Sequence, residues 1–232
     1  DIIPKIYLVK KNIKKKINFY YVSAPKKWQI KIFKILGITE NTLINSFKNK
    51  HIFAEEIISL DHPWYQKGYF QDQVKKIPRW IVHANRKIFL NKAKKTKITK
   101  KIFLDRSSSK FNHCQIYNQK DIYKWIKKNN IEPYKPEKLS LEQQIYLFNK
   151  ASIILGAHGA AFTNIIFCKP GTKIIEIIPS NHPNKKCERI SKILGLKYFR
   201  IITKPDNTNK NFPYRIHLEK KHLKMINKVI NL

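Results

Sequence analysis

At 232 residues, the chain is long enough to bury a full core, either as one large domain or as two small lobes. Its 42% hydrophobic content, with 12% aromatic residues, is that of a globular protein and excludes a disordered one. The formal net charge of +33 raises the alternative of a polyanion-binding protein, but only six of the 48 basic residues are Arg. The lysines are spread along the chain with many Ile and Asn, as an adenine- and thymine-rich genome would encode. We favour that explanation and do not expect a nucleic-acid partner.

The cysteines and the apolar stretches exclude further classes. Cys114, Cys168 and Cys187 form no CxxC pair and are odd in number, so we expect no disulfide framework and no structural zinc site. No apolar run reaches the ~18 residues of a membrane span. The chain starts at Asp1, directly before the apolar stretch 2–9, so we expect a segment of a longer protein.

The first 91 residues predict an incomplete α/β lobe. In chain order we expect a lysine-rich turn at 10–16, a strand at 17–23, a helix at 28–37 ended by Gly37, a strand and turn at 51–60, an aromatic loop at 61–70 and a helix at 78–91.

The basic run at 92–101 is the best candidate for a linker, and the pattern becomes regular after it. Strands are predicted at 101–105, 131–135, 152–156, 173–178 and 197–201. Helices are predicted at 119–129, at 140–150 behind a Ser140–Gln143 capping box, after Gly159, at 185–194 and at 216–230. This alternation predicts a Rossmann-like lobe with a parallel sheet over residues 92–232.

The segment 152–178 carries the strongest functional signal. An apolar strand ends at Gly156, and His158 and Gly159 follow at the turn into a short helix. Ligands of doubly wound sheets bind at the carboxyl ends of such strands, where glycines admit the backbone and helix N-termini favour phosphate. His158 could donate to a phosphate or act as a base, and the alternative is a buried histidine with a satisfied hydrogen bond.

Three further positions have two readings each. Arg106 and Ser107 follow the strand at 101–105, where they could grip a diphosphate, or Arg106 could form an ion pair with Asp105. Asn164 could contact a base or sugar, or serve in capping or core hydrogen bonding. Glu176 interrupts an apolar strand and needs donors, either ribose hydroxyls or a backbone amide.

Several well-known signatures are missing from the sequence. There is no GxGxxG, GxxxxGK[ST] or GxSxG, which argues against a nicotinamide enzyme, a P-loop nucleotidase and a serine hydrolase. Because DxD and HExxH are also missing, we expect no metal ligands and no tightly bound cofactor.

The order and spacing of short segments resemble the catalytic domain of glycosyltransferase family 61. They are LDRS at 104–107, NQKDI at 118–122, LSLEQQIYLF at 139–148, GAHGAAFTN at 156–164 and PGTKIIEIIP at 170–179. FKILGI at 33–38 and the Asp1–Lys5 segment are similar more loosely. The chain departs from the family in having His113–Cys114 where an Arg is usual, and Lys5 in place of another Arg.

The resemblance implies a GT-B architecture of two Rossmann-like lobes, with residues 1–91 as a partial acceptor lobe and 92–232 as the nucleotide-sugar lobe. It further implies an inverting, metal-independent transfer from a nucleotide-sugar, expected to be a UDP-sugar, to a glycan, polysaccharide or glycoprotein. The donor site would comprise Arg106, Ser107, Asn118, His158, Gly159, Asn164 and Glu176, with Glu176 on the ribose. Catalytic roles would fall to His158 and to Asp1 as the base, with Asp61 and His83 as other candidate bases.

Two functions from other classes stay open at this point. One is a non-catalytic nucleotide- or sugar-binding module, and the other is a polyanion-binding basic protein. For a microbial protein we expect a cytoplasmic location or peripheral contact with an anionic membrane face, and for a eukaryotic one the secretory pathway.

Overall fold

The computed structural model describes residues 2–68, 73–97, 99–108, 113–182, 185–205 and 214–232. The chain divides into two compact units. The first comprises Asp1–Gln66 and His83–Asn91, and the second comprises Lys67–Val82 and Lys92–Leu232. Among the described residues, no helix has both the length and the apolar character needed to cross a bilayer.

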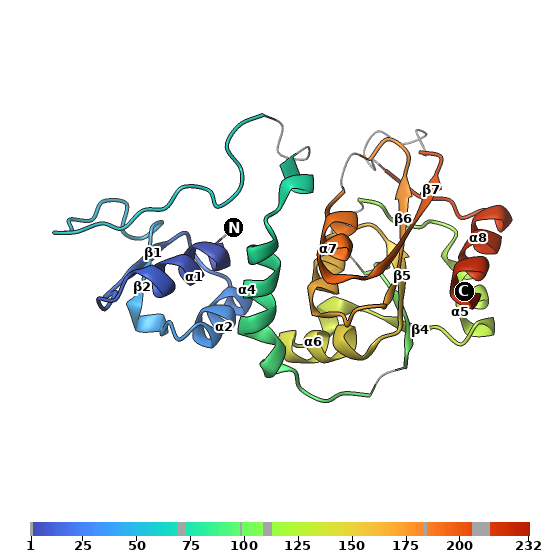
Figure 1. Cartoon of the computed structure of the whole chain (residues 1–232), viewed down its shortest axis with the longest axis horizontal. Helices are drawn as coiled ribbons and strands as arrows, with labels where there is room; N and C mark the ends of the chain where they lie inside the picture. The colour runs from blue at the N-terminus through green and yellow to red at the C-terminus, as the bar shows by residue number, and fades with distance from the viewer. Residues whose placement is uncertain (1, 69–72, 98, 109–112, 183–184, 206–213) are drawn as a thin grey trace. The chain divides into compact units, whose positions relative to one another are not determined.

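The first unit has a small core around a two-stranded parallel sheet (Figure 1). Its elements are α1 Ile2–Asn12, β1 Tyr20–Val22, α2 Lys27–Ile35, η1 Glu40–Thr42, β2 Leu43–Asn45 and η3 Leu90–Lys92, the last of which runs into the second unit. Ile6, Phe33, Leu36 and Ile38 are buried together in this core. Gly37 follows α2 with a φ of 71°, a left-handed conformation that suits glycine at a helix end.

The second unit is built on a five-stranded parallel sheet of order β4-β3-β5-β6-β7. The strands are β3 Lys101–Leu104, β4 Glu132–Tyr134, β5 Ile153–Ala157, β6 Lys173–Pro179 and β7 Lys197–Thr203. The helices are η2 Val74–Lys76, α5 Gln119–Lys128, η4 Pro136–Lys138, α6 Leu141–Lys150, η5 Ala160–Phe167, α7 Lys186–Leu194 and α8 Lys220–Asn231. Helix α4 Arg79–Phe89 begins in this unit and ends in the first.

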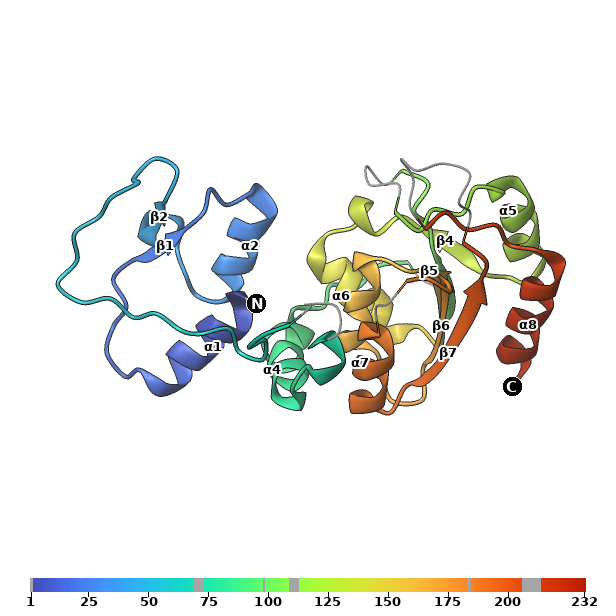
Figure 2. The ribbon, with the colours of Figure 1, turned by 90° about the horizontal axis from the view of Figure 1, so that it is seen from above.

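Helices cover both faces of this sheet. Figures 1 and 2 show α5 and α8 on one face and α6 and α7 on the other. Leu155, Ile175 and Ile201 share a core cluster with residues of α5 and α8. Because side chains alternate along a strand, Glu176 points to the opposite face, toward α7. This alternation decides which helix supplies partners to the buried carboxylate.

The parallel α/β sheet predicted for the second half of the chain is confirmed. Ser140 caps α6 as expected, since its hydroxyl accepts from the Gln143 N–H at 3.2 Å and the Gln143 side chain accepts from the Ser140 N–H at 2.9 Å. The expected short helix after Gly159 is the 3-10 helix η5, and the last helix begins at Lys220 instead of residue 216. There, Ile216 forms an isolated parallel bridge with Ile116 and is thereby committed to extended backbone.

The strand predicted within 51–60 is wrong. These residues form no helix or strand, and Phe53 and Ile57 are 96% and 73% exposed. A segment rich in apolar residues becomes a strand only where a neighbouring strand shares its hydrogen bonds. None of the described strands pairs with this segment.

Candidate functional site

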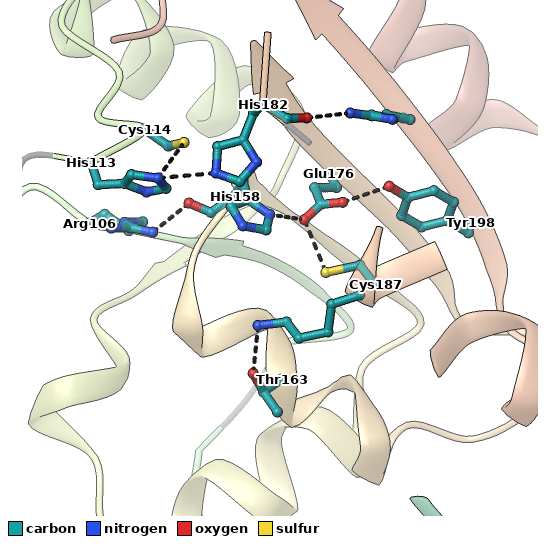
Figure 3. Close-up of polar contacts among 11 residues, drawn as sticks. Arg106, His113, Cys114, His158, Thr163, Glu176, His182, Cys187 and Tyr198 are labelled. Carbon is teal, nitrogen blue, oxygen red and sulfur yellow. Dashed lines mark hydrogen bonds and ion pairs between the residues drawn. The ribbon is translucent and has the colours of Figure 1, made fainter. Parts of the chain in front are cut away.

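The side chain of Arg106 lies against the turn that carries His158. Arg106 lies two residues beyond the end of β3, and its Nη1 donates to the His158 carbonyl at 2.5 Å (Figure 3). A Cβ placed on Gly159 would lie 1.4 Å from Arg106 Nη1, so the guanidinium occupies the space that a side chain would need. Glycine is therefore required at position 159 because a side chain there would clash with Arg106. The backbone conformation does not require it, since a φ of 170° is extended backbone that any residue can adopt.

The loop after β3 is held by Asp105, and among the described residues Arg106 forms no ion pair with that carboxylate. Asp105 is 4% exposed, and its carboxylate accepts from the Ser107 N–H at 2.8 Å, the Ser107 hydroxyl at 3.1 Å and the Tyr123 hydroxyl at 2.5 Å. Lys135 Nζ completes the set at 3.7 Å. These partners fix the direction in which the loop leaves the strand, and with it the position of Arg106. Burial lowers the pKa of Arg106 from its usual value, while Cys114 and Glu137 act in the opposite direction.

His158 is joined to Glu176 by a short buried hydrogen bond. The two strands are in register with Gly156 opposite Glu176, so the residue two positions further along, His158, can turn back over the carboxylate. His158 Nδ1 lies 2.6 Å from Glu176 Oε1, and the side chains are 6% and 1% exposed. The His158 N–H also donates to the Ile177 carbonyl at 2.8 Å, which fixes the backbone of the turn.

Glu176 has two other side-chain partners, contributed by the neighbouring helix and strand. The Cys187 thiol of α7 donates to Oε1 at 3.0 Å, and the Tyr198 hydroxyl of β7 donates to Oε2 at 2.6 Å. Burial raises the pKa of Glu176, but hydrogen bonds from His158, Cys187 and Tyr198 and the charge of His158 outweigh it and leave that pKa lowered. The pKa values of two of these partners change in the opposite direction to that of Glu176. Burial and the nearby carboxylate raise the pKa of both Cys187 and Tyr198. An ionised Glu176 requires the proton of this pair to lie on His158 Nδ1.

Two more histidines lie beside His158. The ring of His182, just beyond β6, has its centroid 4.4 Å from that of His158, and the ring of His113 lies 4.9 Å from that of His182. Burial and the charges of His158 and His113 lower the pKa of His182 to about 4. Burial and the charges of His158 and Arg106 also lower the pKa of His113. At neutral pH both of these rings are therefore uncharged.

The sequence reasoning missed four members of this assembly: His113, His182, Cys187 and Tyr198. His113 was noted only as part of a departure from the family pattern. His182 and Cys187 carry no local signal, because each is one polar residue in a loop or helix. The best available clue was Glu176, since a carboxylate inside an apolar strand requires donors from its neighbours.

The structure gives the two predicted asparagines protein partners. Asn118 Nδ2 donates to the Leu218 carbonyl at 2.9 Å, and Asn118 Oδ1 accepts from the Leu218 N–H at 3.1 Å. Asn164 Nδ2 donates to Gln144 Oε1 at 2.7 Å, which joins η5 to α6. Asn118 thereby fixes the segment that precedes α8.

The candidate bases lie in the N-terminal part of the chain. Asp1 is outside the described residues. Asp61 is exposed in an irregular segment, and His83 is exposed on α4, both within the first unit. The second unit therefore brings together Arg106, His158, Gly159 and Glu176 of the predicted site residues.

This arrangement suits an anion. A guanidinium, an imidazole backed by a carboxylate and the first N–H groups of η5 all lie at the carboxyl ends of parallel strands, where phosphate groups bind in such sheets. Arg106 spends one of its five N–H donors on the His158 carbonyl, and the guanidinium can donate others to an anion. Among the described residues, two groups of metal-ligand type also occur, His113–Cys114–His182 and His158–Glu176–Cys187.

The family model and the similar proteins found by comparison all point to glycosyltransferases. The family model described as Glycosyltransferase 61 matches residues 1–175. The chain is 25% identical over 204 residues to the xylan glycosyltransferase MUCI21 of Arabidopsis thaliana, covering 75% of the chain and 40% of that protein. It is 40% identical over 60 residues to a beta-1,2-xylosyltransferase of Arabidopsis thaliana, covering 26% and 11%. It is 33% identical over 63 residues to the beta-1,2-xylosyltransferase RCN11 of Oryza sativa subsp. japonica, covering 27% and 12%. The chain thus spans less than half the length of these curated relatives.

Proposed function

The chain belongs to the glycosyltransferase 61 family, and from this premise we propose that it transfers a sugar from a nucleotide-sugar to a glycan or polysaccharide. The observation that carries the proposal is the meeting of Arg106, His158 and the start of η5 at the carboxyl ends of β3 and β5. We take the donor to be a UDP-sugar. Because three similar proteins are named as xylan glycosyltransferase or xylosyltransferases, we take xylose as the sugar.

In this proposal the chain's own residues stabilise the departing diphosphate. The acceptor hydroxyl attacks the anomeric carbon from the face opposite the leaving group, so the anomeric configuration inverts, and a base removes the hydroxyl proton. Arg106 donates to the phosphate oxygens, and the first amides of η5 supply further donors. This set of charges needs no divalent cation bridging the diphosphate, so the reaction proceeds without added Mg²⁺ or Mn²⁺.

His158 has a defined part in this scheme. Because Glu176 holds a proton on Nδ1, His158 can donate from Nε2 to the leaving oxygen when both ring nitrogens are protonated. Glu176 stabilises that cation and fixes the ring, and its 1% exposure argues for this positioning role over direct contact with ribose. Ser107 then supports the loop after β3, Asn118 supports the segment before α8, and Asn164 supports η5, since each has a protein partner.

The remaining parts of the proposal concern architecture and setting. We infer a GT-B arrangement in which residues 1–91 belong to an acceptor lobe that supplies the base, from Asp1, Asp61 or His83. In a eukaryotic cell, transfer to glycans would occur in the secretory pathway.

The test uses the chain as it is. We expect UDP to raise its melting temperature, and UDP-xylose to be consumed with release of UDP in the presence of a xylan acceptor, without added Mg²⁺ or Mn²⁺. His158→Ala should lower the transfer rate at least about tenfold, whereas His51→Ala, on an exposed irregular segment, should not change it.

The outcomes separate the candidate functions. If UDP stabilises the chain but no donor sugar is released with any acceptor, the chain is a nucleotide-binding module. Without any stabilisation by UDP or UDP-sugars, the transferase proposal fails. Steeply salt-dependent binding to a polyanion would then favour a role for the net charge of +33.

A further inference from the structure

Two loops at the edge of the large sheet bring together three side chains of metal-ligand type. His113 and Cys114 lie between β3 and α5, and His182 lies just beyond β6. His182 Nε2 is 3.0 Å from His113 Nε2, and Cys114 Sγ is 3.9 Å from the same His113 atom. All three ligand atoms lie within 4.8 Å of one another, as Figure 3 illustrates. Imidazole nitrogen and thiolate sulfur are the ligands that Zn²⁺ prefers.

The separations match those of a tetrahedral ion. With Zn–N of about 2.05 Å and Zn–S of about 2.3 Å, ligand atoms of a tetrahedron are about 3.3 Å apart for two nitrogens and about 3.6 Å for nitrogen and sulfur. The two measured separations, 3.0 Å and 3.9 Å, each lie within about 0.3 Å of these values. Three ligands of this set would leave the fourth tetrahedral position for water.

The backbone at Cys114 supports the same reading. Its φ is 55°, a left-handed conformation that costs a residue other than glycine about 1 kcal/mol or more. Adjacent side chains on an extended backbone point in opposite directions, whereas the left-handed turn lets His113 and Cys114 reach the same centre. Cys114 is 0% exposed, His182 is 6% exposed and His113 is partly exposed, so an ion held there would be partly shielded from bulk water.

We propose that His113, Cys114 and His182 form a Zn²⁺-binding site. The second group, His158–Glu176–Cys187, is a weaker candidate, because the His158 imidazole and the Cys187 thiol already form hydrogen bonds to the same Glu176 oxygen. The His113–Cys114–His182 group contains no carboxylate that could play this part. The two imidazole nitrogens are joined by one N–H···N hydrogen bond, which Zn²⁺ binding would replace with two N–Zn bonds.

The test is a titration of the metal-free full chain with Zn²⁺ alone, followed by isothermal calorimetry. We expect one Zn²⁺ per chain and no competition from Mg²⁺, which prefers oxygen ligands. Cys114→Ser and His182→Gln should each lower the affinity at least about tenfold. Cys168→Ser, at another buried cysteine, and His51→Gln, at an exposed histidine, are the matched controls and should bind like the unaltered chain.

A spectroscopic arm identifies the thiolate. Titration with Co²⁺ should produce a thiolate-to-metal charge-transfer band that is lost in Cys114→Ser and kept in Cys168→Ser. Circular dichroism checks that the variants are folded, and His182→Gln provides a second variant should Cys114→Ser not fold.

Three results would overturn the proposal: no uptake of Zn²⁺ by the unaltered chain, unchanged affinity in Cys114→Ser and His182→Gln, or loss of binding in Cys187→Ser alone. No nucleotide is present in these measurements, so their failure leaves the proposed transferase activity untouched.

Discussion

His158 and His182 lie side by side at one edge of the sheet but have different partners. His158 Nδ1 contacts the Glu176 carboxylate at 2.6 Å, whereas His182 Nε2 contacts the imidazole of His113 at 3.0 Å. Burial, followed by the charges of His158 and His113, lowers the pKa of His182 to about 4. One histidine at this sheet edge thus has a carboxylate partner and the other an imidazole partner, and the two proposals assign them different roles: proton donor for His158 and neutral Zn²⁺ ligand for His182.

The largest expected effect comes from removing the carboxylate that distinguishes the two histidines. Glu176→Gln should lower the transfer rate about as much as His158→Ala does, at least about tenfold, because a neutral amide does not stabilise the His158 cation. Steady-state kinetics with UDP-xylose measures this, and Tyr198→Phe, which removes only the bond to Oε2, should have a smaller effect. An unaltered rate in Glu176→Gln would show that the carboxylate does not support a role for His158 in transfer.

The same carboxylate predicts how stability depends on pH. Because hydrogen bonds and the charge of His158 lower the folded-state pKa of Glu176 below 4.5, its ionised form stabilises the fold above that pH. The free energy of unfolding should fall as the pH drops from 4.5 through the folded-state pKa. Urea unfolding of Glu176→Gln should show a lower plateau at neutral pH and a shallower fall toward acid. Parallel curves for the two proteins would contradict an ionised Glu176.

Removing the guanidinium of Arg106 tests the proposed binding of the diphosphate. Arg106→Ala should weaken UDP binding at least about tenfold, because one charged hydrogen bond contributes about 1.5–3 kcal/mol. Zn²⁺ affinity should stay the same, since Arg106 is not among the proposed ligands. Arg79→Ala, at an exposed arginine that begins α4, is the matched control for calorimetry with UDP. Unfolding of Arg106→Ala, with normal UDP affinity in the native fraction, would show that Arg106 is structural.

Gly159→Ala sharpens the same point with one methyl group. The new Cβ would overlap Arg106 Nη1, so the guanidinium must move while the extended backbone at Gly159 is kept. We expect a severalfold loss of UDP affinity, up to about tenfold, or ~1.4 kcal/mol. The melting temperature should change little. A large drop in melting temperature without a loss of UDP affinity would count against the proposed position of Arg106.

The smallest effect is expected away from both histidines. Ser140→Ala removes the cap of α6 and should cost about 1 kcal/mol of unfolding free energy. Rates, UDP affinity and Zn²⁺ affinity should all stay unchanged. Chemical denaturation measures the cost, and a change in any of the three functional readouts would show that α6 is coupled to the sheet edge.

How much could be predicted from the sequence differs between the two halves of the chain. In the second half, buried strands such as 152–156 and 173–178 were predictable because apolar runs between turn signals specify them locally. The segment 51–60 was not, because its exposed apolar residues pair with none of the described strands. In the candidate site, Arg106, His158, Gly159 and Glu176 could be singled out as polar or glycine residues at strand ends or inside an apolar strand.

By itself, the sequence determined the alternation of strands and helices and the capping of α6, and it singled out the residues proposed to bind an anion, because these depend on local periodicity and on residues a few positions apart. Only the tertiary structure decided which residues meet there. The register of β5 and β6 sets His158 over Glu176, α7 and β7 add Cys187 and Tyr198, and the loop after β6 brings His182 to His113. These contacts join residues 11 to 69 positions apart, and a local pattern carries no information on such pairings.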